Sequence, residues 1–221
     1  MSDAVMPPQV PTQAPTQARP HTNSYTNAVT GATSNPLMPV PDAVDEAFAD
    51  GANRVLAGAV ELARVVVGAH QAAAAVMVDR DWSTVRKFFS LSEKYAAWRD
   101  YATPATGYGT HGWLLGQAGC VRLTQAELEA HPQWKHFGTE AAKHPPMRGW
   151  MAVPITDRAG TVWGLLQLSD RYEGEFTAED ERHFTSFAAL VSEALEALWD
   201  VRNLRKAAPQ GERGAPTPRS A

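Results

Sequence analysis

Two apolar segments in the C-terminal half of the chain give the clearest structural signal in the sequence. They cover residues 149–156 and 161–169, and the turn-forming sequence DRAG at 157–160 joins them, which predicts a β-hairpin. Each segment is almost continuously apolar, so we expect both faces of these strands to be covered. Pro154 lacks a backbone donor and therefore predicts an edge or bulge position in the first strand.

A long amphipathic helix is predicted to follow the hairpin. Thr177, with Asp180 three residues later, is typical of a capped helix start. The apolar residues that follow fall on one stripe, made of Phe184, Phe187, Val191, Leu195 and Leu198. We expect this helix to end near Leu204.

The N-terminal half of the predicted domain begins with a helix and continues with two strands. Asp42 is a plausible N-cap after Pro41, and Gly68 is the expected helix stop. Between them, apolar residues recur at helical spacing: Val44, Phe48, Val55, Leu62 and Val66. The short apolar run at 71–78 predicts a buried strand, and residues 84–91 are predicted to be its hairpin partner.

The middle of the chain has an irregular pattern with shorter elements. Helices are predicted at 93–99 and 113–117, a strand at 120–123, and a further helix capped by Thr124 and Glu127. Together the elements predict an α+β fold, in which a central antiparallel sheet of five to six strands carries helices on both faces.

Composition sets the expected domain boundaries and excludes some classes of function. Residues 1–41 hold eight of the sixteen prolines and few charges, so we expect disorder there and at 205–221, with one folded domain at 42–204. A net charge of −4 and a pI near 6 argue against nucleic acid as a partner. The sequence shows neither a secretory-signal pattern nor an apolar stretch of membrane-spanning length, so we expect a cytoplasmic protein without a membrane partner.

The order of these elements and several short motifs resemble the GAF domain family. The matching residues are Val153-Pro154-Ile155, Gly160, Gly164-Leu165-Leu166, FTAED at 176–180, Gly68-Ala69-His70 and a glycine-rich stretch at 107–119. The resemblance covers about residues 42–204, and its middle segments look like those of bacterial sensor histidine kinases. It implies a fold of the GAF and PAS type, in a sensory or regulatory module that is not an enzyme.

The other known uses of the family need residues that do not match this sequence. Reduction of free methionine sulfoxide needs a thiolate and a resolving cysteine, whereas Cys120 is the single cysteine here, so a redox enzyme that uses Cys120 is a remote alternative. Covalent bilin attachment needs a surrounding pattern that Cys120 lacks, and a buried structural thiol is the favoured interpretation. The cyclic-nucleotide motif of the family is not present. We therefore expect no catalytic residue and no cofactor.

Histidines are the remaining candidates for a metal or haem site. His131, His136 and His144 are close in sequence, but their spacing does not place them on one helical face, and no ligand pattern accompanies them. Surface or loop positions are therefore favoured, and we expect no metal site. A haem ligand at His111 or His144 stays open as an alternative.

Aromatic residues concentrate between positions 88 and 113, where the resembled fold covers its ligand-binding face. They either roof the core or form the walls of a pocket. Arg148 could hold a carboxylate or phosphate with two hydrogen bonds, or it could simply cap a loop, and Gln167 must find a partner if it is buried. The candidate ligand-binding residues are Tyr95, Trp98, Tyr101, Trp113, Arg148 and Trp150.

The sequence and the resemblance together predict a non-catalytic sensory or regulatory module that binds a small molecule of unknown identity. Its signal would leave through a partner protein or through a homodimer of the terminal helices, where the apolar stripe continues to Val201. The alternative is a ligand-free interaction scaffold of the same fold, in which the aromatic residues themselves fill the pocket.

Overall fold

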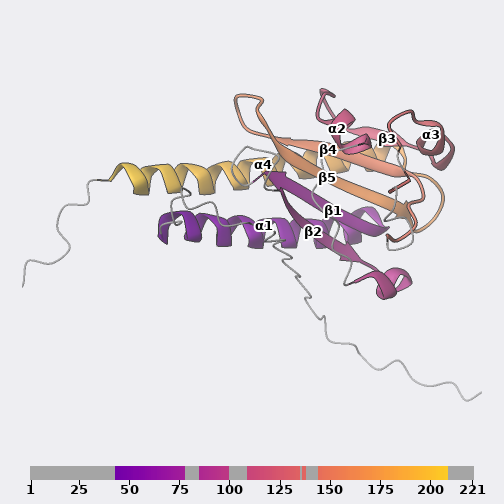
Figure 1. Ribbon diagram of the computed structural model, residues 1–221, viewed down its shortest axis with the longest axis horizontal. Helices are drawn as coiled ribbons and strands as arrows, with labels where there is room; N and C mark the ends of the chain where they lie inside the picture. Colours follow the sequence, from indigo (N-terminus) through magenta and orange to yellow (C-terminus); the bar gives the residue numbers. More distant parts are fainter. Residues whose placement is uncertain (1–42, 78–84, 100–108, 135, 138–143, 209–221) are drawn as a thin grey trace, which may run out of the picture.

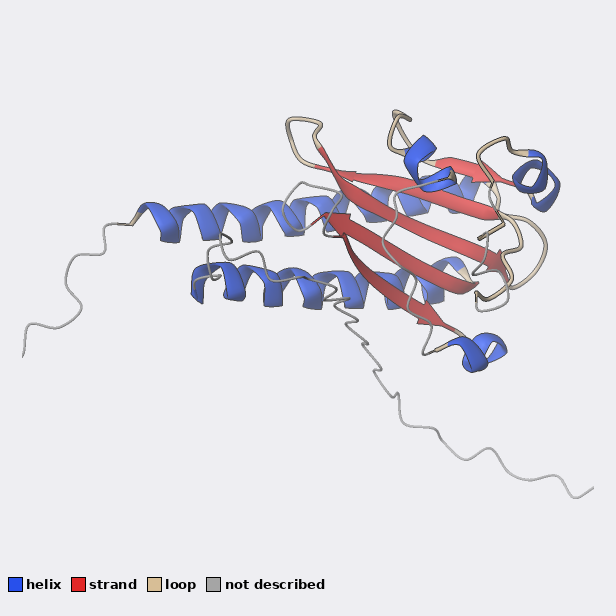
Figure 2. Cartoon of the chain, in the orientation of Figure 1, coloured by secondary structure: helices blue, strands red, loops and turns tan. Residues whose placement is uncertain are grey.

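The computed structural model describes residues 43–77, 85–99, 109–134, 136–137 and 144–208. Its centre is a five-stranded antiparallel sheet in the order β2-β1-β5-β4-β3, which confirms the predicted α+β class (Figures 1 and 2). The elements are α1 (Ala43–Val67), β1 (Ala69–Met77), β2 (Val85–Leu91), the 3-10 helix η1 (Glu93–Trp98), α2 (Thr110–Leu114), β3 (Val121–Leu123), α3 (Gln125–Ala130), β4 (Trp150–Thr156), β5 (Val162–Arg171) and α4 (Ala178–Ala207).

The two long helices α1 and α4 cover one face of the sheet, which we call the inner face (Figure 2). Its core combines one side of each helix with alternate residues of the strands, among them Leu56, Val153, Leu166, Phe184 and Leu195. The short helices α2 and α3 contribute Leu114 and Leu128 to a second apolar cluster on the opposite, outer face. Helices therefore lie on both faces of the sheet, as the apolar strands predict.

The buried side of α1 differs from the stripe that the sequence predicts. Leu56, Ala59 and Ala63 face the sheet and are buried, whereas Leu62 and Val66 of the predicted stripe are 52% and 68% exposed. Alanine side chains let a helix axis approach a sheet closely, so the contact surface depends on side-chain size as well as on hydrophobicity.

Beyond the sheet, α1 and α4 continue side by side as a helical stalk, which lies to the left in Figure 1. Gly51 of α1 packs against Leu198 of α4, and a Cβ atom at Gly51 would stand 3.1 Å from Cδ2 of Leu198. Arg202 and Lys206 of α4 each form an ion pair of 2.5 Å with the carboxylate of Asp45. These contacts join the start of α1 to the last turns of α4.

The positions of Pro154 and Gly164 explain how the hairpin strands fit the sheet. β3 pairs with residues 150–152 of β4, so Pro154 lies beyond this pairing, where the described residues place no strand on that side of β4. It is also next to a register shift at Ile155/Thr156. This confirms the predicted edge or bulge position. Gly164 of β5 pairs with Val76 of β1, and a Cβ atom at Gly164 would come within 2.8 Å of the Val76 Cα and closer still to the Ala75 carbonyl oxygen.

The predicted helix ends depend on short local motifs, and most are confirmed. Thr124 with Glu127 and Thr177 with Asp180 form complete capping boxes at the starts of α3 and α4. Gly68 ends α1 with a φ of +77°, a left-handed conformation that suits glycine. α4 continues to Ala207, past the predicted end at Leu204.

The remaining differences concern α2 and the limits of the described chain. α2 spans Thr110–Leu114 and not the predicted 113–117, because Gly109, at a φ of +76°, lets the helix begin earlier. The predicted cap Asp42, Thr84, the predicted tail at 1–41 and residues 209–221 of the tail predicted at 205–221 lie outside the described residues. Residues 205–207 of that predicted tail are helical, because α4 continues through them. Among the helices that are described, none combines the length and apolar character of a membrane span.

We expect Gly164→Ala to lower the free energy of unfolding by about 3 kcal/mol or more, because the new methyl group overlaps the β1 backbone. Gly58→Ala is the matched control, since a Cβ atom there has no neighbour within 4 Å among the described residues. It should raise the stability by up to about 1 kcal/mol through helix propensity. Urea denaturation of the full chain measures both. A Gly164→Ala variant as stable as the parent would contradict the pairing of Gly164 with Val76.

Candidate functional site

The outer face of the sheet is the part of the molecule where polar side chains enter an apolar cluster. Opposite residues of an antiparallel pair share a face, so the register places Gln167 of β5 beside Ala73 of β1 and Ala152 of β4. We call the apolar residues around it the outer-face cluster. Its buried members are Ala75, Leu114, Leu128, Met147, Trp150, Ala152 and Leu165. Half-buried aromatic and aliphatic side chains pack against it from α2, β3 and the segment after α3.

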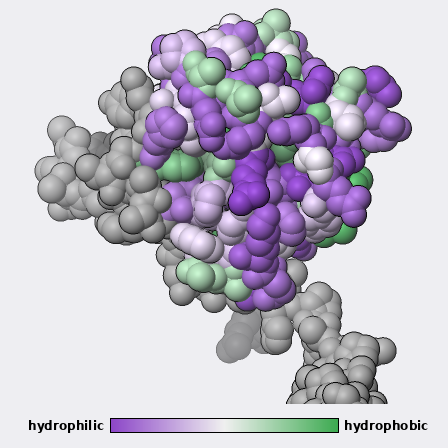
Figure 3. All heavy atoms as spheres, turned by 90° about the vertical axis from the view of Figure 1, so that its right-hand side faces the viewer, coloured by the Kyte–Doolittle hydropathy of each residue, from purple (hydrophilic) through white to green (hydrophobic). Residues whose placement is uncertain are grey.

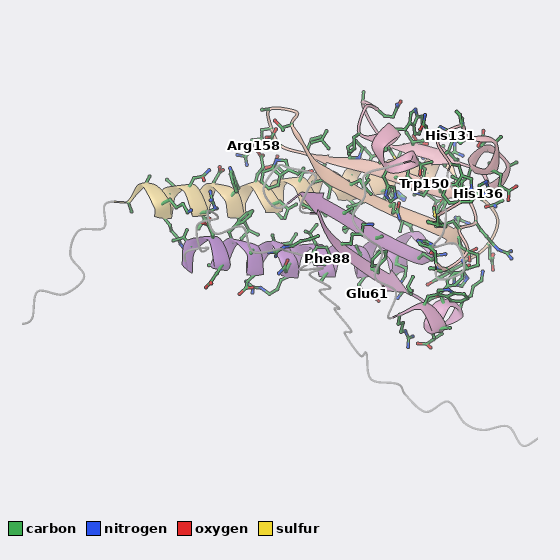
Figure 4. The ribbon with its side chains drawn as sticks, viewed as in Figure 1. Glu61, Phe88, His131, His136, Trp150 and Arg158 are labelled. Carbon is green, nitrogen blue, oxygen red and sulfur yellow. The ribbon has the colours of Figure 1, made fainter. Side chains whose placement is uncertain are left out.

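One amide side chain connects the outer-face cluster to α2. The indole Nε1 of Trp150 donates a hydrogen bond of 2.9 Å to Oε1 of Gln167, and Nε2 of His111 lies 2.6 Å from the same oxygen. His111 also stacks on Trp150, with ring centroids 6.2 Å apart (Trp150 is labelled in Figure 4). Gln167 therefore has the partners that its position in an apolar strand requires, and one comes from β4 and the other from α2.

Two histidine rings near this network are held in the neutral state. Burial and the nearby charge of Lys87, partly offset by the hydrogen bond to Gln167, lower the pKa of His111 to about 4. Burial likewise lowers the pKa of His144 to about 4, with contributions from Lys87 and His111, and its ring stacks on Phe137. Burial lowers the pKa of Lys87 to about 8, so this amine stays largely protonated at neutral pH.

A second polar group lies at the end of β5 and fixes η1 to the sheet. The buried carboxylate of Asp170 accepts hydrogen bonds of 2.5 Å from the hydroxyl of Tyr95 and from Nζ of Lys94. Burial and the contact with Asp170 together raise the pKa of Tyr95 well above its usual value. Asp170 itself has a φ of +57°, in the left-handed region. Because one oxygen of this carboxylate binds both Lys94 and Tyr95, the group is a structural link between η1 and β5.

Arg148 has a fixed backbone and an exposed side chain. Its N–H donates to Oγ of Ser169 at 3.2 Å, and its carbonyl accepts from the N–H of Asp170 at 2.8 Å. Two residues earlier, the carbonyl of Pro146 accepts a 2.7 Å bond from the side chain of Gln71. Within the described residues the guanidinium makes no hydrogen bond or ion pair, so a rigid loop presents a charged group to solvent.

Comparison with known families identifies this architecture. The sequence profile of the GAF domain family matches residues 49–196, which is more than half of the chain. The chain belongs to the GAF domain family. A comparison with curated protein sequences finds no match.

Solved GAF structures share the fold at low sequence identity. The blue-light absorbing form of the PixJ GAF domain from Thermosynechococcus elongatus is 15% identical, with a TM-score of 0.56 over 79% of this chain and 100% of that one. The cyanobacteriochrome TePixJ GAF domain is 16% identical, with a TM-score of 0.53 over 74% and 99%. The free methionine-R-sulfoxide reductase from Neisseria meningitidis, solved with its substrate, is 18% identical, with a TM-score of 0.50 over 72% and 87%.

The structure distributes the predicted ligand-binding residues of this GAF domain over two places. Tyr95 is buried and Trp98 half-buried on η1, where their rings meet edge to face at 5.7 Å. Trp113 is half-buried on α2, and Trp150 is fully buried in the outer-face cluster. Tyr101 lies outside the described residues. With Arg148 exposed in its loop, the six residues do not form one described cluster, and their role in binding stays a prediction.

The sequence pattern does not indicate the position that two polar residues, His111 and Lys87, have on the outer face. The sequence identifies Gln167 as a polar residue inside an apolar strand, whereas for His111 it offers only a haem ligand as a role. Lys87 gave no distinct signal, because an alternating edge strand often carries lysine. Its cross-strand pairing with Ala75 places it on the outer face of the GAF sheet.

Cys120 lies just before β3, half-buried against the inner core. Burial raises the pKa of its thiol to about 11, so the reactive thiolate is scarce at neutral pH. Among the described residues, no group of three or more His, Cys, Asp and Glu side chains is arranged to hold a metal ion.

A separate apolar cleft lies at the junction of the stalk with the inner face. Its walls come from α1, α4 and strands β1, β2 and β5, and they include Phe48, Trp163 and Trp199. Arg86 and Asn53 lie at its polar side and hydrogen-bond to each other at 2.8 Å. The cleft therefore offers hydrophobic contact with little chemistry, unlike the outer face of the GAF domain.

The neutral histidines predict a loss of stability in mild acid. In the unfolded chain His111 and His144 bind protons near pH 6.5, but in the folded chain only near pH 4. Their contribution is therefore fully present above about pH 6.5 and is lost as the pH falls toward 4, on the order of 2 kcal/mol per ring.

The His111→Gln variant should flatten this decline between pH 6.5 and 5, because the amide still donates to Gln167 but does not titrate. His183→Gln, at an exposed position of α4, is the control and should keep the parental profile. Chemical denaturation at a series of pH values measures the difference. Identical profiles for the parent and His111→Gln would contradict the buried neutral imidazole.

Proposed function

We propose that this GAF domain is a non-catalytic sensory or regulatory module that binds a small molecule on its outer face and passes the change on through α1 and α4. The observation that carries the proposal is the group of Gln167, His111 and Trp150, in which oriented polar atoms are set among apolar walls. Small-molecule sites combine mostly apolar linings with a few positioned polar groups. The sensory photoreceptor domains among the similar structures support the same kind of use.

The non-catalytic part of the proposal is supported by the state of the single cysteine. The similar reductase from Neisseria meningitidis acts on methionine sulfoxide, a reaction that in this fold needs reactive thiols. Here the thiol of Cys120 is protonated at neutral pH and packs toward the inner core, away from the outer-face cluster. An enzyme that uses Cys120 is therefore disfavoured.

The link from the outer face to α4 runs through the β4–β5 hairpin. Trp150 and Gln167 lie on its two strands, and Arg158 in its turn contacts three carboxylates of α4 (Figure 4): those of Glu193 at 3.1 Å, Glu196 at 2.9 Å and Asp200 at 3.1 Å. Each exposed ion pair stabilises little by itself. Together they tie the hairpin turn to the helix that leads into the stalk, so a ligand-driven shift of β4 or β5 can reach α4.

The exposed apolar residues support a second copy of the chain as the partner. Among the described residues, every exposed large hydrophobic side chain except Tyr172 lies on α1 or α4: Leu62, Val65, Val66, Leu190, Val201 and Leu204. By contrast, the end of the molecule that carries η1 and α3 is mostly hydrophilic (Figure 3). Exposed apolar side chains on these two helices favour association, and a homodimer through them would place two outer faces under common control.

The full burial of Trp150 favours a second candidate function. Its side chain is 0% exposed and packs with Leu114 and Leu128, so the domain's own residues fill this part of the outer face. A ligand-free interaction scaffold would use the same fold with the pocket closed.

A thermal-shift screen of the full chain separates the two candidates. A broad panel of nucleotides, amino acids, small acids and neutral aromatic compounds should contain a compound that raises the melting temperature, since binding to the folded state stabilises it. Arg148→Ala should keep the parental stability, because the exposed side chain makes no described ion pair. It should reduce the ligand-induced rise in melting temperature if Arg148 contacts the ligand. Arg182→Ala, an exposed position on α4, is the control. No stabilisation across the panel would favour the scaffold.

Disruption of the apolar helix surface tests the homodimer. Leu190 is 70% exposed, and Leu190→Glu should convert a dimer to a monomer without loss of the fold. Thr185→Glu adds the same charge on a different side of α4 and should leave the dimer intact. Analytical ultracentrifugation over a range of concentrations gives the mass of each. A parental chain that is monomeric at every concentration would refute this part of the proposal.

A further inference from the structure

The side chains on the outer face are shortest in the middle of β1. The residues of β1 that lie directly beside Gln167 and Leu165 on this face are Ala73 and Ala75, whose side chains are a single methyl group, whereas Gln71 nearer the start of the strand bonds to the Pro146 carbonyl. On one side they are flanked by Gln167 and Leu165 of β5, and on the other by Phe89 and Lys87 of β2. Two rows of long side chains thus stand on either side of a row of short ones.

The hydrogen atoms on the Gln167 network follow from the chemistry of its members. An indole N–H can only donate, so the atom of Gln167 that Trp150 contacts is the amide oxygen. Because Nε2 of His111 meets the same oxygen, this nitrogen must carry the proton of the neutral ring, and Nδ1 is bare. Two polar atoms of these side chains take no part in the shared hydrogen bonds: the amide nitrogen of Gln167 and Nδ1 of His111.

Both of these atoms remain available for a further bond. Within the part of the chain that the structure describes, neither the amide nitrogen of Gln167 nor Nδ1 of His111 has a hydrogen-bond partner. Gln167 and His111 are both half-buried, so the two atoms lie at the boundary between the apolar cluster and solvent. Oriented but unpaired polar atoms in such a place are typical of a ligand contact.

Among the described residues, positive charge acts on the two histidine rings of this region. The electrostatic influence on His111 comes from Lys87, and that on His144 comes from Lys87 and His111. Three basic side chains, from β2, α2 and the segment before β4, thus share one region of the outer face.

We infer that this region is an anion subsite, which receives the carboxylate or phosphate group of a small molecule against Lys87, Gln167 and His111. Lys87 supplies positive charge, and the amide of Gln167 donates a hydrogen bond to the anion. His111 takes up a proton at Nδ1 as the anion enters, which turns its bare nitrogen into a second donor while Nε2 keeps its bond to Gln167. The inference rests on the proposed function, because it names the chemical class of the outer-face ligand.

Uptake of a proton with the ligand gives the subsite a distinct pH dependence. His111 is neutral in the free protein at pH 7, and Lys87 and His144 are the charged and titratable groups that act on it. An anion that binds the protonated ring must pull one proton from solution. The affinity should therefore rise as the pH falls from 7.5 to 5.5, by up to about tenfold per pH unit.

Titration of the ¹⁵N-labelled full chain with named probes tests the subsite. The probes are succinate and glycerol phosphate, with succinamide and glycerol as their neutral counterparts, at constant ionic strength. Binding should shift the indole N–H resonance of Trp150 and the side-chain amide resonance of Gln167, because these groups share one oxygen. A response to succinate indicates a carboxylate ligand, and a response to glycerol phosphate indicates a phosphate ligand.

Two variants connect the response to the named residues. Lys87→Met removes the charge at similar length, and Gln167→Glu keeps an oxygen for Trp150 and His111 but replaces the donating amide by a carboxylate. Each should weaken anion binding by at least about tenfold. Lys206→Met removes the same charge from the stalk and should not change it. If the Gln167→Glu variant does not fold, the Lys87→Met variant and the pH dependence of binding still test the anion subsite.

Three outcomes would overturn the inference: neutral probes that bind as well as the anions, anion binding that survives both variants, or affinity that does not change with pH. If a neutral aromatic compound stabilises the protein and the anions do not bind, the anion subsite is refuted while the outer-face sensor stands. If no compound of any class binds, both proposals fail together with the thermal-shift screen.

Discussion

The carbonyl oxygen of Gln167 accepts hydrogen bonds from Trp150 and His111 at once, and the arrangement of the outer face depends on this shared acceptor. The two bonds join β5, β4 and α2, elements that are separated along the chain, in the centre of an apolar cluster. They also decide which nitrogen of His111 carries the proton and which way the amide of Gln167 points. An apolar residue in place of His111 would remove the hydrogen bond that joins α2 to Gln167. This would cost free energy, because the amide oxygen of Gln167 would lose one of its two partners.

The two faces of the sheet differ in the kinds of side chain that they carry. The inner face is an apolar core between the sheet and the long helices, and it continues into a stalk joined by Gly51, Leu198 and the ion pairs of Asp45. The outer face combines apolar walls with basic and amide groups over short alanine side chains. The β4–β5 hairpin belongs to both, since its strands carry Trp150 and Gln167 while Arg158 in its turn contacts α4. The hairpin therefore connects the outer face of the sheet directly to α4.

Local motifs made much of this fold predictable from the sequence. The hairpin, the two capping boxes and the glycine that ends α1 each depend on a few neighbouring residues, and all are confirmed. Features that depend on contacts between residues far apart in the sequence are less predictable from the sequence alone. The buried side of α1 follows from how closely alanines let it approach the sheet, and the partner of Gln167 is a histidine 56 positions away. Lys87 belongs to the candidate site because the strand register places it beside Ala75, a pairing that the sequence pattern does not reveal.

The protonation state of His111 gives the most direct test of this arrangement. Nitrogen-15 NMR of the histidine rings distinguishes the two neutral tautomers from each other and from the charged ring. At pH 7 we expect His111 as the neutral tautomer with its proton on Nε2, because that nitrogen must donate to the oxygen that Trp150 also contacts. A proton on Nδ1 with Nε2 bare, or a ring that is already doubly protonated at pH 7, would contradict the shared acceptor and the anion subsite built on it.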